Sequence, residues 1–284
     1  KKESSTQFRG KIVTTFAGVM RLIIDQGNSS IKLTTFEKGI ATAGAASESD
    51  DAVQFVSNFV KDCPIEATMY CSVRRAYNKP LQEWLQAHAA KAICFDEKTL
   101  LPIAIGYRTP HTLGYDRIAA AVGAQTIFPQ RNILIIDAGT AITYDLLSAD
   151  GIFVGGNIAP GADLRLQSLH EHTGRLPLVG TQGDTPLWGY DTETALRSGS
   201  LQGIAYEIEG YIHECSKRYD ELLVFLTGGD AERLAAMTKR VIFALKNEEI
   251  PQVPASREST EVIFLDRNLV PKGLNRILEY NVEI

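Results

Sequence analysis

The sequence predicts an α/β protein whose two halves repeat one strand-turn-strand unit. Residues 22–29 read LIIDQGNS and residues 134–140 read LIIDAGT, so an aliphatic strand twice ends in aspartate, one further residue and glycine. The two aspartates are separated by 137 minus 25, or 112, positions. The same offset relates Gly39-Ile40 to Gly151-Ile152. A spacing that is kept across two turns indicates an internal duplication and therefore two related domains.

Asp25 and Asp137 each stand where an apolar strand gives way to a tight glycine turn. Such a turn frees backbone N–H groups beside a carboxylate, an arrangement that suits a metal-bound phosphate. Asp and Gly are also ordinary turn residues, and an isolated copy would most simply end a strand. Because two copies occur in register, both interpretations stay open, and two facing copies would hold the phosphates of a nucleotide between them.

The composition is that of an ordinary globular protein, with 284 residues of which 44% are hydrophobic. This length accommodates two domains with a core in each. The net charge of -5 argues against a general nucleic-acid binder, which needs a basic face, and favours small molecules as partners. Four cysteines without a C-x-x-C pair indicate neither a zinc cluster nor a disulfide framework, and a reducing cytoplasm fits best. No apolar run approaches the length of a membrane span.

Two stretches are expected to lie outside the repeated fold. Residues 1–19 are interpreted as an N-terminal extension, because Met20 stands directly before the first strand. Residues 247–261 are polar and contain two prolines, which predicts a surface loop. The rest of the chain is expected to form a first domain over residues 20–130 and a second over residues 131–284.

Alternation of apolar and polar residues, together with turn and capping signals, places the other elements of the first half. Strands are expected over residues 31–36, 40–46 and 67–73, and an alanine-rich helix over residues 118–128. Asp50-Asp51 begins one amphipathic helix that Pro64 closes, and Asn78 caps another. His88 is interpreted as a residue at the edge of the core on the inward stripe of that second helix, rather than as a ligand.

In the second half, strands are expected over residues 141–147, 152–154, 222–226 and 262–265, and helices over residues 192–211 and from Leu269 onward. Residues 155–161 (GGNIAPG) are expected to form a loop that lets the backbone approach a ligand closely. Residues 227–230 (TGGD) form a third glycine turn, suited to a base or ribose. A metal site at His170-Glu171-His172 is disfavoured, because side chains two positions apart on a helix point in different directions.

The pair Asp116-Arg117 stands at the start of the alanine-rich helix. An acidic residue there favours the helix dipole, and an arginine beside it is readily solvated. On this pair alone, the simplest interpretation is structural.

Six motifs, taken in order, resemble those of the type III pantothenate kinases, members of the actin, Hsp70 and sugar-kinase superfamily. They are Asp25-Gln26-Gly27-Asn28-Ser29, Gly114-Tyr115-Asp116-Arg117, Asp137-Ala138-Gly139-Thr140, Gly155-Gly156-Asn157-Ile158-Ala159-Pro160-Gly161, Thr227-Gly228-Gly229-Asp230 and Lys272-Gly273-Leu274-Asn275. The resemblance covers nearly the whole chain from Met20 onward. Two departures are Ser29, where the family usually has threonine, and residues 247–261, which look like an insertion.

The resemblance implies two ribonuclease-H-like domains of the actin-like ATPase type, with a nucleotide cleft between them. It also implies transfer of the ATP γ-phosphate to the primary hydroxyl of pantothenate, the first step towards coenzyme A. The family works as a cytoplasmic homodimer whose interface helps to build the substrate site, and it needs ATP with Mg²⁺ and a monovalent cation, K⁺ or NH₄⁺.

The same resemblance assigns roles to individual residues. Asp116 would be the general base, Asp25 would lie near magnesium, and Asp137 would bind the monovalent cation. ATP would contact Asp25, Gln26, Gly27, Asn28, Ser29, Ser30, Ile31, Lys32 and Thr140. Pantothenate would contact Tyr107, Gly114, Tyr115, Asp116, Arg117 and Thr192. From its charge, Arg117 is expected to pair with the carboxylate of pantothenate.

These assignments reverse the structural interpretation of Asp116. A carboxylate suffices as base in phosphoryl transfer, because the reaction depends on positioning more than on basicity. Two rivals stay open: a kinase of the same superfamily that acts on another small alcohol such as a sugar, and a non-catalytic regulator that binds nucleotide. The presence of Asp25, Asp116 and Asp137 argues against the regulator, and neither a Walker motif nor G-x-G-x-x-G is present.

Overall fold

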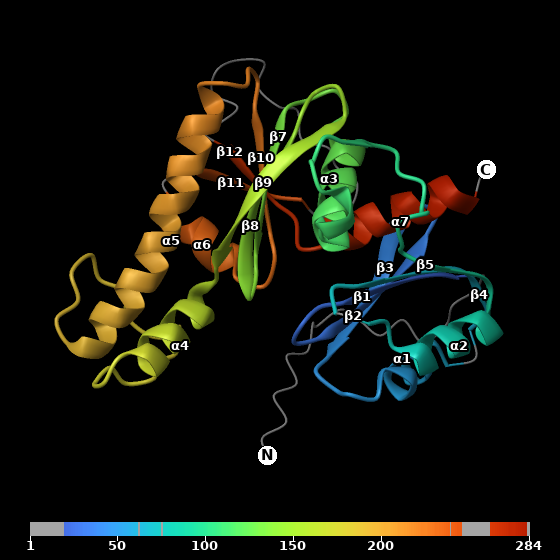
Figure 1. Ribbon diagram of the computed structural model, residues 1–284, viewed down its shortest axis with the longest axis horizontal. Coiled ribbons are helices and arrows are strands. Elements are labelled where there is room, and N and C mark those ends of the chain that lie inside the picture. The colour runs from blue at the N-terminus through green and yellow to red at the C-terminus, as the bar shows by residue number, and fades with distance from the viewer. Residues whose placement is uncertain (1–19, 62, 75, 239, 246–261, 283–284) are drawn as a thin grey trace. The chain divides into compact units, whose positions relative to one another are not determined.

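The structure is a computed structural model (Figure 1) that describes residues 20–282 apart from 62, 75, 239 and 246–261. The expectations for residues 1–19 and 247–261 therefore lie outside the described residues. The chain divides into two compact units, of which the first comprises residues 1–126 and Leu269–Ile284 and the second comprises Ile127–Asn268. The division falls near the expected boundary at residue 130, but the last helix groups with the first unit.

The first unit is built on a five-stranded sheet in the order β3-β2-β1-β4-β5. Its strands are β1 (Met20–Gln26), β2 (Ile31–Glu37), β3 (Ile40–Ser47), β4 (Ile65–Ser72) and β5 (Ala89–Cys94). Strands β1, β2 and β3 form the antiparallel meander that the sequence predicts, whereas β4 runs parallel to β1 and β5 parallel to β4. The central strand β1 is thus hydrogen-bonded on both sides, and every residue except Arg21 is buried.

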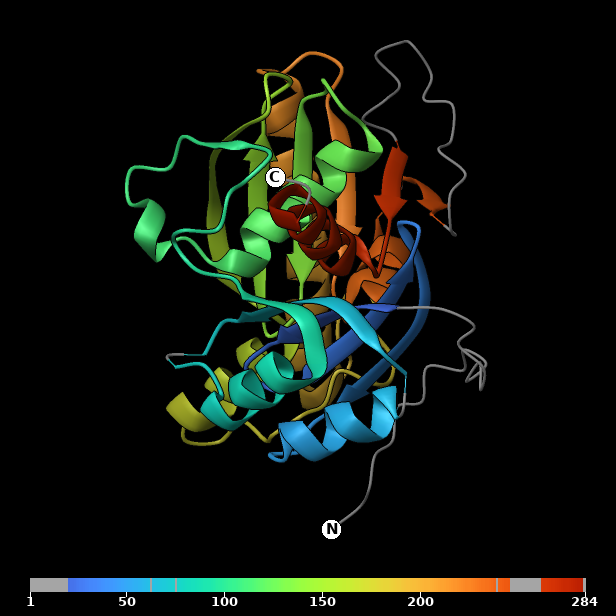
Figure 2. The same cartoon turned by 90° about the vertical axis from the view of Figure 1, so that its right-hand side faces the viewer.

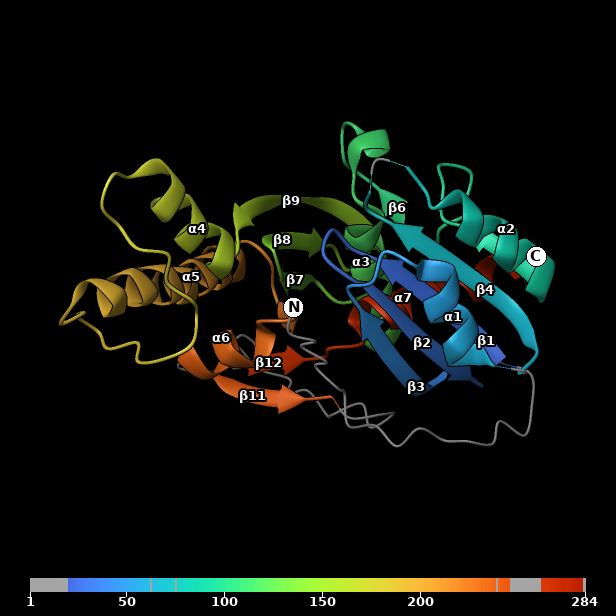
Figure 3. The same cartoon turned by 90° about the horizontal axis from the view of Figure 1, so that it is seen from below.

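Helices α1 (Ala52–Val60) and α2 (Lys79–His88) pack on one face of this sheet, as Figure 3 shows. The predicted caps are present: Asp51 accepts from the backbone N–H of Gln54 at 2.9 Å, and Asn78 accepts from that of Leu81 at 3.0 Å. The expectation for His88 was wrong, because its side chain is exposed and its ring stacks on Trp84 with 4.2 Å between centroids. One helical turn separates the two rings, so their contact is local.

Two further helices, α3 (Tyr115–Ile127) and α7 (Leu269–Val282), belong to the first unit except for the last residue of α3. Helix α7 contacts β1 and β4, and Arg21 on β1 donates to Glu279 on α7 at 2.7 Å. Figure 2 shows α3 in green and α7 in red side by side. Their close approach depends on two glycines, because a Cβ on Gly123 would overlap the carbonyl of Leu269 and one on Gly273 that of Ala119. Two short elements, β6 (Ala104–Ile105) and the 3₁₀ turn Pro110–Thr112, precede α3.

The sheet of the second unit repeats the topology of the first. Its strands are β7 (Ile133–Ala138), β8 (Ala141–Leu147), β9 (Ile152–Pro160), β10 (Leu223–Thr227), β11 (Val241–Ala244) and β12 (Val262–Leu265), in the order β11-β12-β10-β7-β8-β9. Strands β7, β8 and β9 are antiparallel and β10 is parallel to β7, as β4 is to β1. The predicted duplication is confirmed.

One expectation in this sheet was wrong. Residues 155–160 were expected to form a loop, but they continue β9 as a strand paired with β8. The ladder shifts register between Leu146 and Leu147, so the strand absorbs an irregularity opposite Gly155. Only Gly161 stands outside the strand, where it is the N-cap of the next helix.

Helices α4 (Ala162–His172), α5 (Thr192–Ser216) and α6 (Ala231–Met237) complete the second unit. The inward face of α5 (Leu201, Ile204, Ile208 and Ile212) packs with α6 against apolar residues of β7, β8 and β10. No helix in the described part of the chain is long and apolar enough to cross a membrane.

The contact between α3 and α7 gives a prediction about stability. Gly273→Ala should lower the free energy of unfolding by about 1–3 kcal/mol, because the added methyl has to displace backbone of α3. The matched control is Gly210→Ala on α5, where a Cβ meets open space and better helix propensity should stabilise by up to about 1 kcal/mol. Urea unfolding measures both variants, and equal stabilities would contradict the packing argument.

Candidate active site

Asp25 lies at the carboxyl end of β1, where the sheet sets it opposite Lys32 on β2 and Cys71 on β4. Its side chain is buried, with 9% of the residue exposed. Burial raises the pKa of Asp25 to about 6, the positive charge of Lys32 opposes this rise, and the negative charge of Asp116 adds to it. Two carboxylates and one exposed lysine of the first unit therefore act on one another electrostatically.

Asp116 stands in the first turn of α3, and its Oδ1 accepts a hydrogen bond from the backbone N–H of Arg117 at 2.9 Å. A Cβ on Gly114 would overlap this same oxygen, so glycine at this position leaves room for the carboxylate. Burial raises the pKa of Asp116, while the N–H and charge of Arg117 and the charge of Lys32 lower it. The result is a carboxylate that is more basic than an exposed aspartate and is held by its own helix.

The turn after Asp25 is fastened by a residue that the sequence analysis missed. Its backbone closes with Gly27 N–H donating to Ser30 at 2.9 Å. Arg74, which follows β4, donates to the carbonyls of Gly27 and Asn28, both at 3.3 Å. Arg74 has no motif around it in the sequence, and only the parallel pairing of β4 with β1 brings it to this turn.

The predicted ATP-binding residues of the first unit do not all face outward. Asn28, Ser29 and Lys32 are exposed, whereas Gln26 and Ile31 are 4% and 2% exposed. The amide oxygen of Gln26 accepts hydrogen bonds from the hydroxyls of Tyr70 and Ser72. The side chain of Gln26 thus ties the end of β1 to β4, and its backbone carbonyl accepts from the N–H of Val73, just after β4, at 3.1 Å.

The residues predicted to contact pantothenate gather around the start of α3. Arg117 is 6% exposed, and its guanidinium carbon lies 5.9 Å from the centroid of the Tyr107 ring. The ring of Tyr115 stacks on Phe95 with 4.5 Å between centroids. Tyr107 thus lies beside Arg117, whereas Tyr115, at the first position of α3, is held against Phe95.

In the second unit, three glycine turns meet beside Asp137. A Cβ on Gly228 would crowd Oδ1 of Asp137 and overlap the carbonyl of Ala138, and one on Gly161 would overlap the carbonyl of Gly139. Backbone hydrogen bonds fix the same contacts, from Asp230 to Ala138 at 3.0 Å and from Gly161 to Thr140 at 2.9 Å. The structure therefore brings the motifs at residues 137–140, 161 and 227–230 together, although they are far apart in the sequence.

Thr192, the remaining predicted substrate contact, is exposed at the first position of α5. Its neighbour Asp191 caps this helix and forms a capping box with Thr194. Within the described residues, no group of three or more His, Cys, Asp or Glu side chains has the arrangement of a metal centre.

Comparison with known proteins identifies the family. The family model for type III pantothenate kinase matches residues 21–214. The chain belongs to the type III pantothenate kinase family. A type III pantothenate kinase of Bacteroides fragilis strain YCH46 is 42% identical over 270 residues, which cover 92% of this chain and 98% of the relative. One of Phocaeicola vulgatus is 39% identical over 264 residues, covering 92% and 99%.

Two solved structures share the fold of this pantothenate kinase family member over most of the chain. A Campylobacter jejuni protein described as a Baf-family transcriptional activator aligns with a TM-score of 0.57 at 23% identity, covering 93% of this chain and all of that one. A Sinorhizobium meliloti protein described as a 2-dehydro-3-deoxygalactonokinase aligns with a TM-score of 0.54 at 13% identity, with the same coverage. At these identities the likeness concerns the fold alone.

The raised pKa of Asp25 predicts a pH-dependent effect on stability. A raised pKa means that the folded protein binds the proton more tightly than the unfolded chain, so this contribution to stability is lost as pH rises from about 4 through about 6. Asp25→Asn should therefore raise the free energy of unfolding by about 2 to 3 kcal/mol at pH 8, without nucleotide and with chelator, and by little at pH 4.

Urea unfolding at several pH values measures this difference between the variant and the unaltered protein. The exposed carboxylate of Asp50 offers a matched control, because Asp50→Asn should change stability little at either pH. If the free energy of unfolding of Asp25→Asn differs from that of the unaltered protein by the same amount at pH 4 and pH 8, the ionised carboxylate of Asp25 is not destabilised by its surroundings.

Proposed function

We propose that this chain transfers the γ-phosphate of ATP to the primary hydroxyl of pantothenate, the first step of coenzyme A biosynthesis. The observation that carries the proposal is the cluster of Asp25, Asp116 and Lys32 in a chain of the type III pantothenate kinase family. A kinase of this kind needs a base for the hydroxyl, cations on the phosphates and groups that fix the geometry. The described residues offer a candidate for each task.

Asp116 is the general base in this proposal. It accepts the proton of the pantothenate hydroxyl as the hydroxyl oxygen attacks phosphorus, and the bond from phosphorus to the bridging oxygen of ADP breaks in line. Its raised pKa supports the role, because burial makes the carboxylate a better proton acceptor. Gly114 and the N–H of Arg117 fix the position of the carboxylate.

Residues 25–32 bind the phosphates of ATP, and Thr140 of the second unit contacts the same nucleotide. Exposed Lys32 supplies a positive charge, and Arg74 holds the turn in shape through the carbonyls of Gly27 and Asn28. The donor set near Asp25 fits Mg²⁺, which prefers carboxylate oxygens and phosphates. When bound, Mg²⁺ neutralises charge on the phosphates, and it would also relieve the repulsion between the Asp25 and Asp116 carboxylates.

Pantothenate contacts Tyr107, Tyr115, Asp116 and Arg117, together with Gly114 and Thr192. Arg117 is the cation that suits the carboxylate of pantothenate, and its burial would strengthen such a pair by excluding water. Asp137 takes a monovalent cation, K⁺ or NH₄⁺, in company with the carbonyl oxygens around it.

The chain acts as a homodimer in the cytoplasm in this proposal. Large apolar side chains are exposed on the second unit, and they include Ile158, Leu164, Leu178, Leu187, Trp188, Tyr190 and Tyr206. Exposed apolar residues in such number favour burial against a second copy. Cys71, Cys94 and Cys215 are free thiols, as a reducing compartment would keep them. Sedimentation equilibrium checks the dimer, which a purely monomeric protein at micromolar concentration would contradict.

Asp116→Asn tests the assignment of the base. The variant should lose about 10²–10⁴-fold in kcat for ADP release with pantothenate, because the amide cannot accept the proton. Binding of ATP, measured by calorimetry, should stay within a few-fold of the unaltered protein. Near-normal turnover would remove Asp116 from the role, and loss of ATP binding would point to a structural defect.

The cation assignment is tested by ADP release with K⁺ and then Na⁺ as the only monovalent cation. The unaltered protein should turn over faster with K⁺, and Asp137→Asn should lose most of this difference, because the carboxylate that binds the ion is gone. The control is Asp150→Asn, an exposed carboxylate in the turn between β8 and β9, which should keep the K⁺ response. A full K⁺ response in Asp137→Asn would refute the site.

A further inference from the structure

The segment between α4 and α5 has no helix or strand, yet side chains from two helices bind its backbone. Four of its carbonyl oxygens accept hydrogen bonds: those of Gly180 and Asp184 from Arg197, that of Thr181 from Arg233, and that of Thr185 from Gln202. Arg197 and Gln202 lie on α5, and Arg233 lies on α6. The segment is therefore ordered by side chains rather than by secondary structure.

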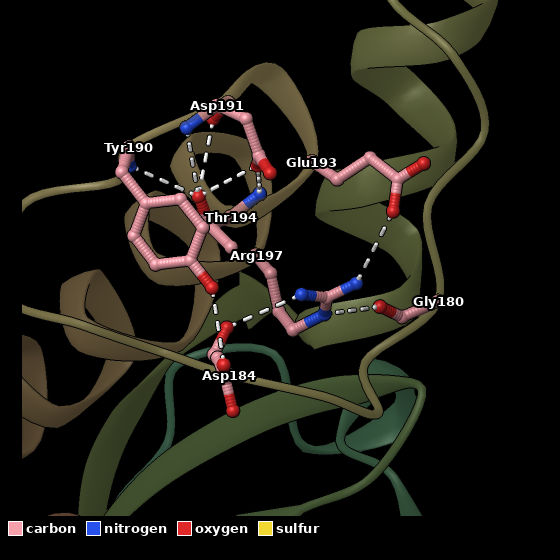
Figure 4. A network of polar contacts seen from close by, with 7 residues as sticks. All are labelled: Gly180, Asp184, Tyr190, Asp191, Glu193, Thr194 and Arg197. Atoms are coloured by element: carbon pink, nitrogen blue, oxygen red, sulfur yellow. Dashed lines mark hydrogen bonds and ion pairs between the residues drawn. The ribbon is translucent and has the colours of Figure 1, made fainter.

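Arg197 is the centre of this arrangement, which Figure 4 shows from close by. Its Nε donates to Gly180 at 3.0 Å and its Nη1 donates to Asp184 at 3.2 Å, while Nη2 lies 3.9 Å from the carboxylate of Glu193. The residue is only 8% exposed. A buried guanidinium has to be hydrogen-bonded, and here two backbone carbonyls are its near partners.

The backbone of the segment is shaped to fit around this guanidinium. Gly183 has φ = 116°, which other residues rarely adopt, and a Cβ there would lie 3.0 Å from the guanidinium carbon of Arg197. A Cβ on Gly189 would overlap the backbone of Ala195 on α5. The two glycines thus let the segment lie flat against the first turns of α5.

The far end of the segment leads directly into the predicted substrate contact. Thr194 accepts hydrogen bonds from the N–H groups of Tyr190 and Asp191, both at 3.1 Å, and its own N–H donates to the Asp191 carboxylate at 2.8 Å. The Tyr190 hydroxyl also donates to the Asp184 side chain at 3.1 Å. Arg197 binds the carbonyl of Asp184, the side chain of Asp184 binds Tyr190, and Tyr190 binds Thr194. These contacts therefore connect Arg197 to the start of α5, where Thr192 lies.

We propose that Arg197 is a positioning residue for the pantothenate subsite: by clamping Gly180 and Asp184 it fixes the path of the chain into α5 and so the place of Thr192. The inference rests on the proposed function. Arg197 is not assigned any contact with substrate, and its action runs through the backbone of residues 180–191. The clamp should matter for pantothenate and not for ATP.

The test is steady-state ADP release with Arg197→Ala, varying pantothenate and ATP in turn. The KM for pantothenate should rise at least tenfold, while kcat and the KM for ATP stay within about twofold. Arg197→Lys should give an intermediate KM for pantothenate, because an ammonium keeps the charge but cannot span both carbonyls as the planar fork does. This second variant also keeps the test valid if the alanine variant folds poorly.

The matched control is Arg240→Ala. Arg240 forms an ion pair at 2.6 Å with Glu209, which lies on α5 far along the helix from Thr192. This variant should leave all three kinetic constants unchanged. An unchanged KM for pantothenate in Arg197→Ala overturns the inference, as does a rise shared equally by both substrates or by the control.

A second readout does not depend on activity. Trp188 lies within the segment and is 83% exposed, and the sequence has one other tryptophan, Trp84, which Trp84→Phe removes. In that background, and at a concentration below that at which the protein dimerises, time-resolved anisotropy of Trp188 should show faster local motion after Arg197→Ala and no change after Arg240→Ala. Identical decays overturn the clamp. If the unaltered protein does not turn over pantothenate, the proposed function is overturned, and the assignment of the pantothenate subsite with it. The anisotropy measurement would still test whether Arg197 holds residues 180–191 in place.

Discussion

The structure depends on one constraint, which is that strands β1 and β7 are hydrogen-bonded on both sides and buried along most of their length. On both strands the aspartate stands near the end, where the chain leaves the sheet. The parallel neighbour ends at the same edge, so β4 brings Cys71 opposite Asp25 and β10 brings Thr227 opposite Asp137. Each aspartate therefore meets a second turn: Arg74 follows β4, and Gly228 follows β10.

The electrostatics of the first unit follow from this placement. Asp25 is buried and Asp116 is half-buried, and loss of water raises the pKa of each carboxylate. Lys32 acts on both carboxylates and Arg117 acts on Asp116, but they compensate only in part, because both pKa values stay raised. Two interacting carboxylates with raised pKa values destabilise the folded chain when both are ionised, a trade that functional sites commonly make. In the proposed reaction, the bound cation would supply further positive charge beside the carboxylates of Asp25 and Asp116.

How much of this could be predicted from the sequence depended on whether a feature leaves a local pattern. The duplicated strands, the caps at Asp51 and Asn78 and the turn residues each have a pattern, and the structure confirms them. Residues 155–160 misled because glycine and proline favour loops, whereas pairing with β8 holds them in a strand. Arg74 and Arg197 could not be found, because bonds from a side chain to distant backbone carbonyls depend on tertiary structure and leave no periodicity. Exposed His88 shows that a helical stripe predicts the inward face but not where that face ends.

The glycines of the motifs do two kinds of work, and the distinction explains the last motif. Gly114, Gly161 and Gly228 make room for a carboxylate or for another turn at the candidate site, whereas Gly273 makes room for the backbone of α3. Two residues on, Asn275 is buried and donates to Glu279 at 3.0 Å, and Glu279 accepts from Arg21 of β1 at 2.7 Å. The C-terminal motif thus fastens α7 to the strand that ends in Asp25. Support of that strand is therefore a physical reason for the presence of this motif.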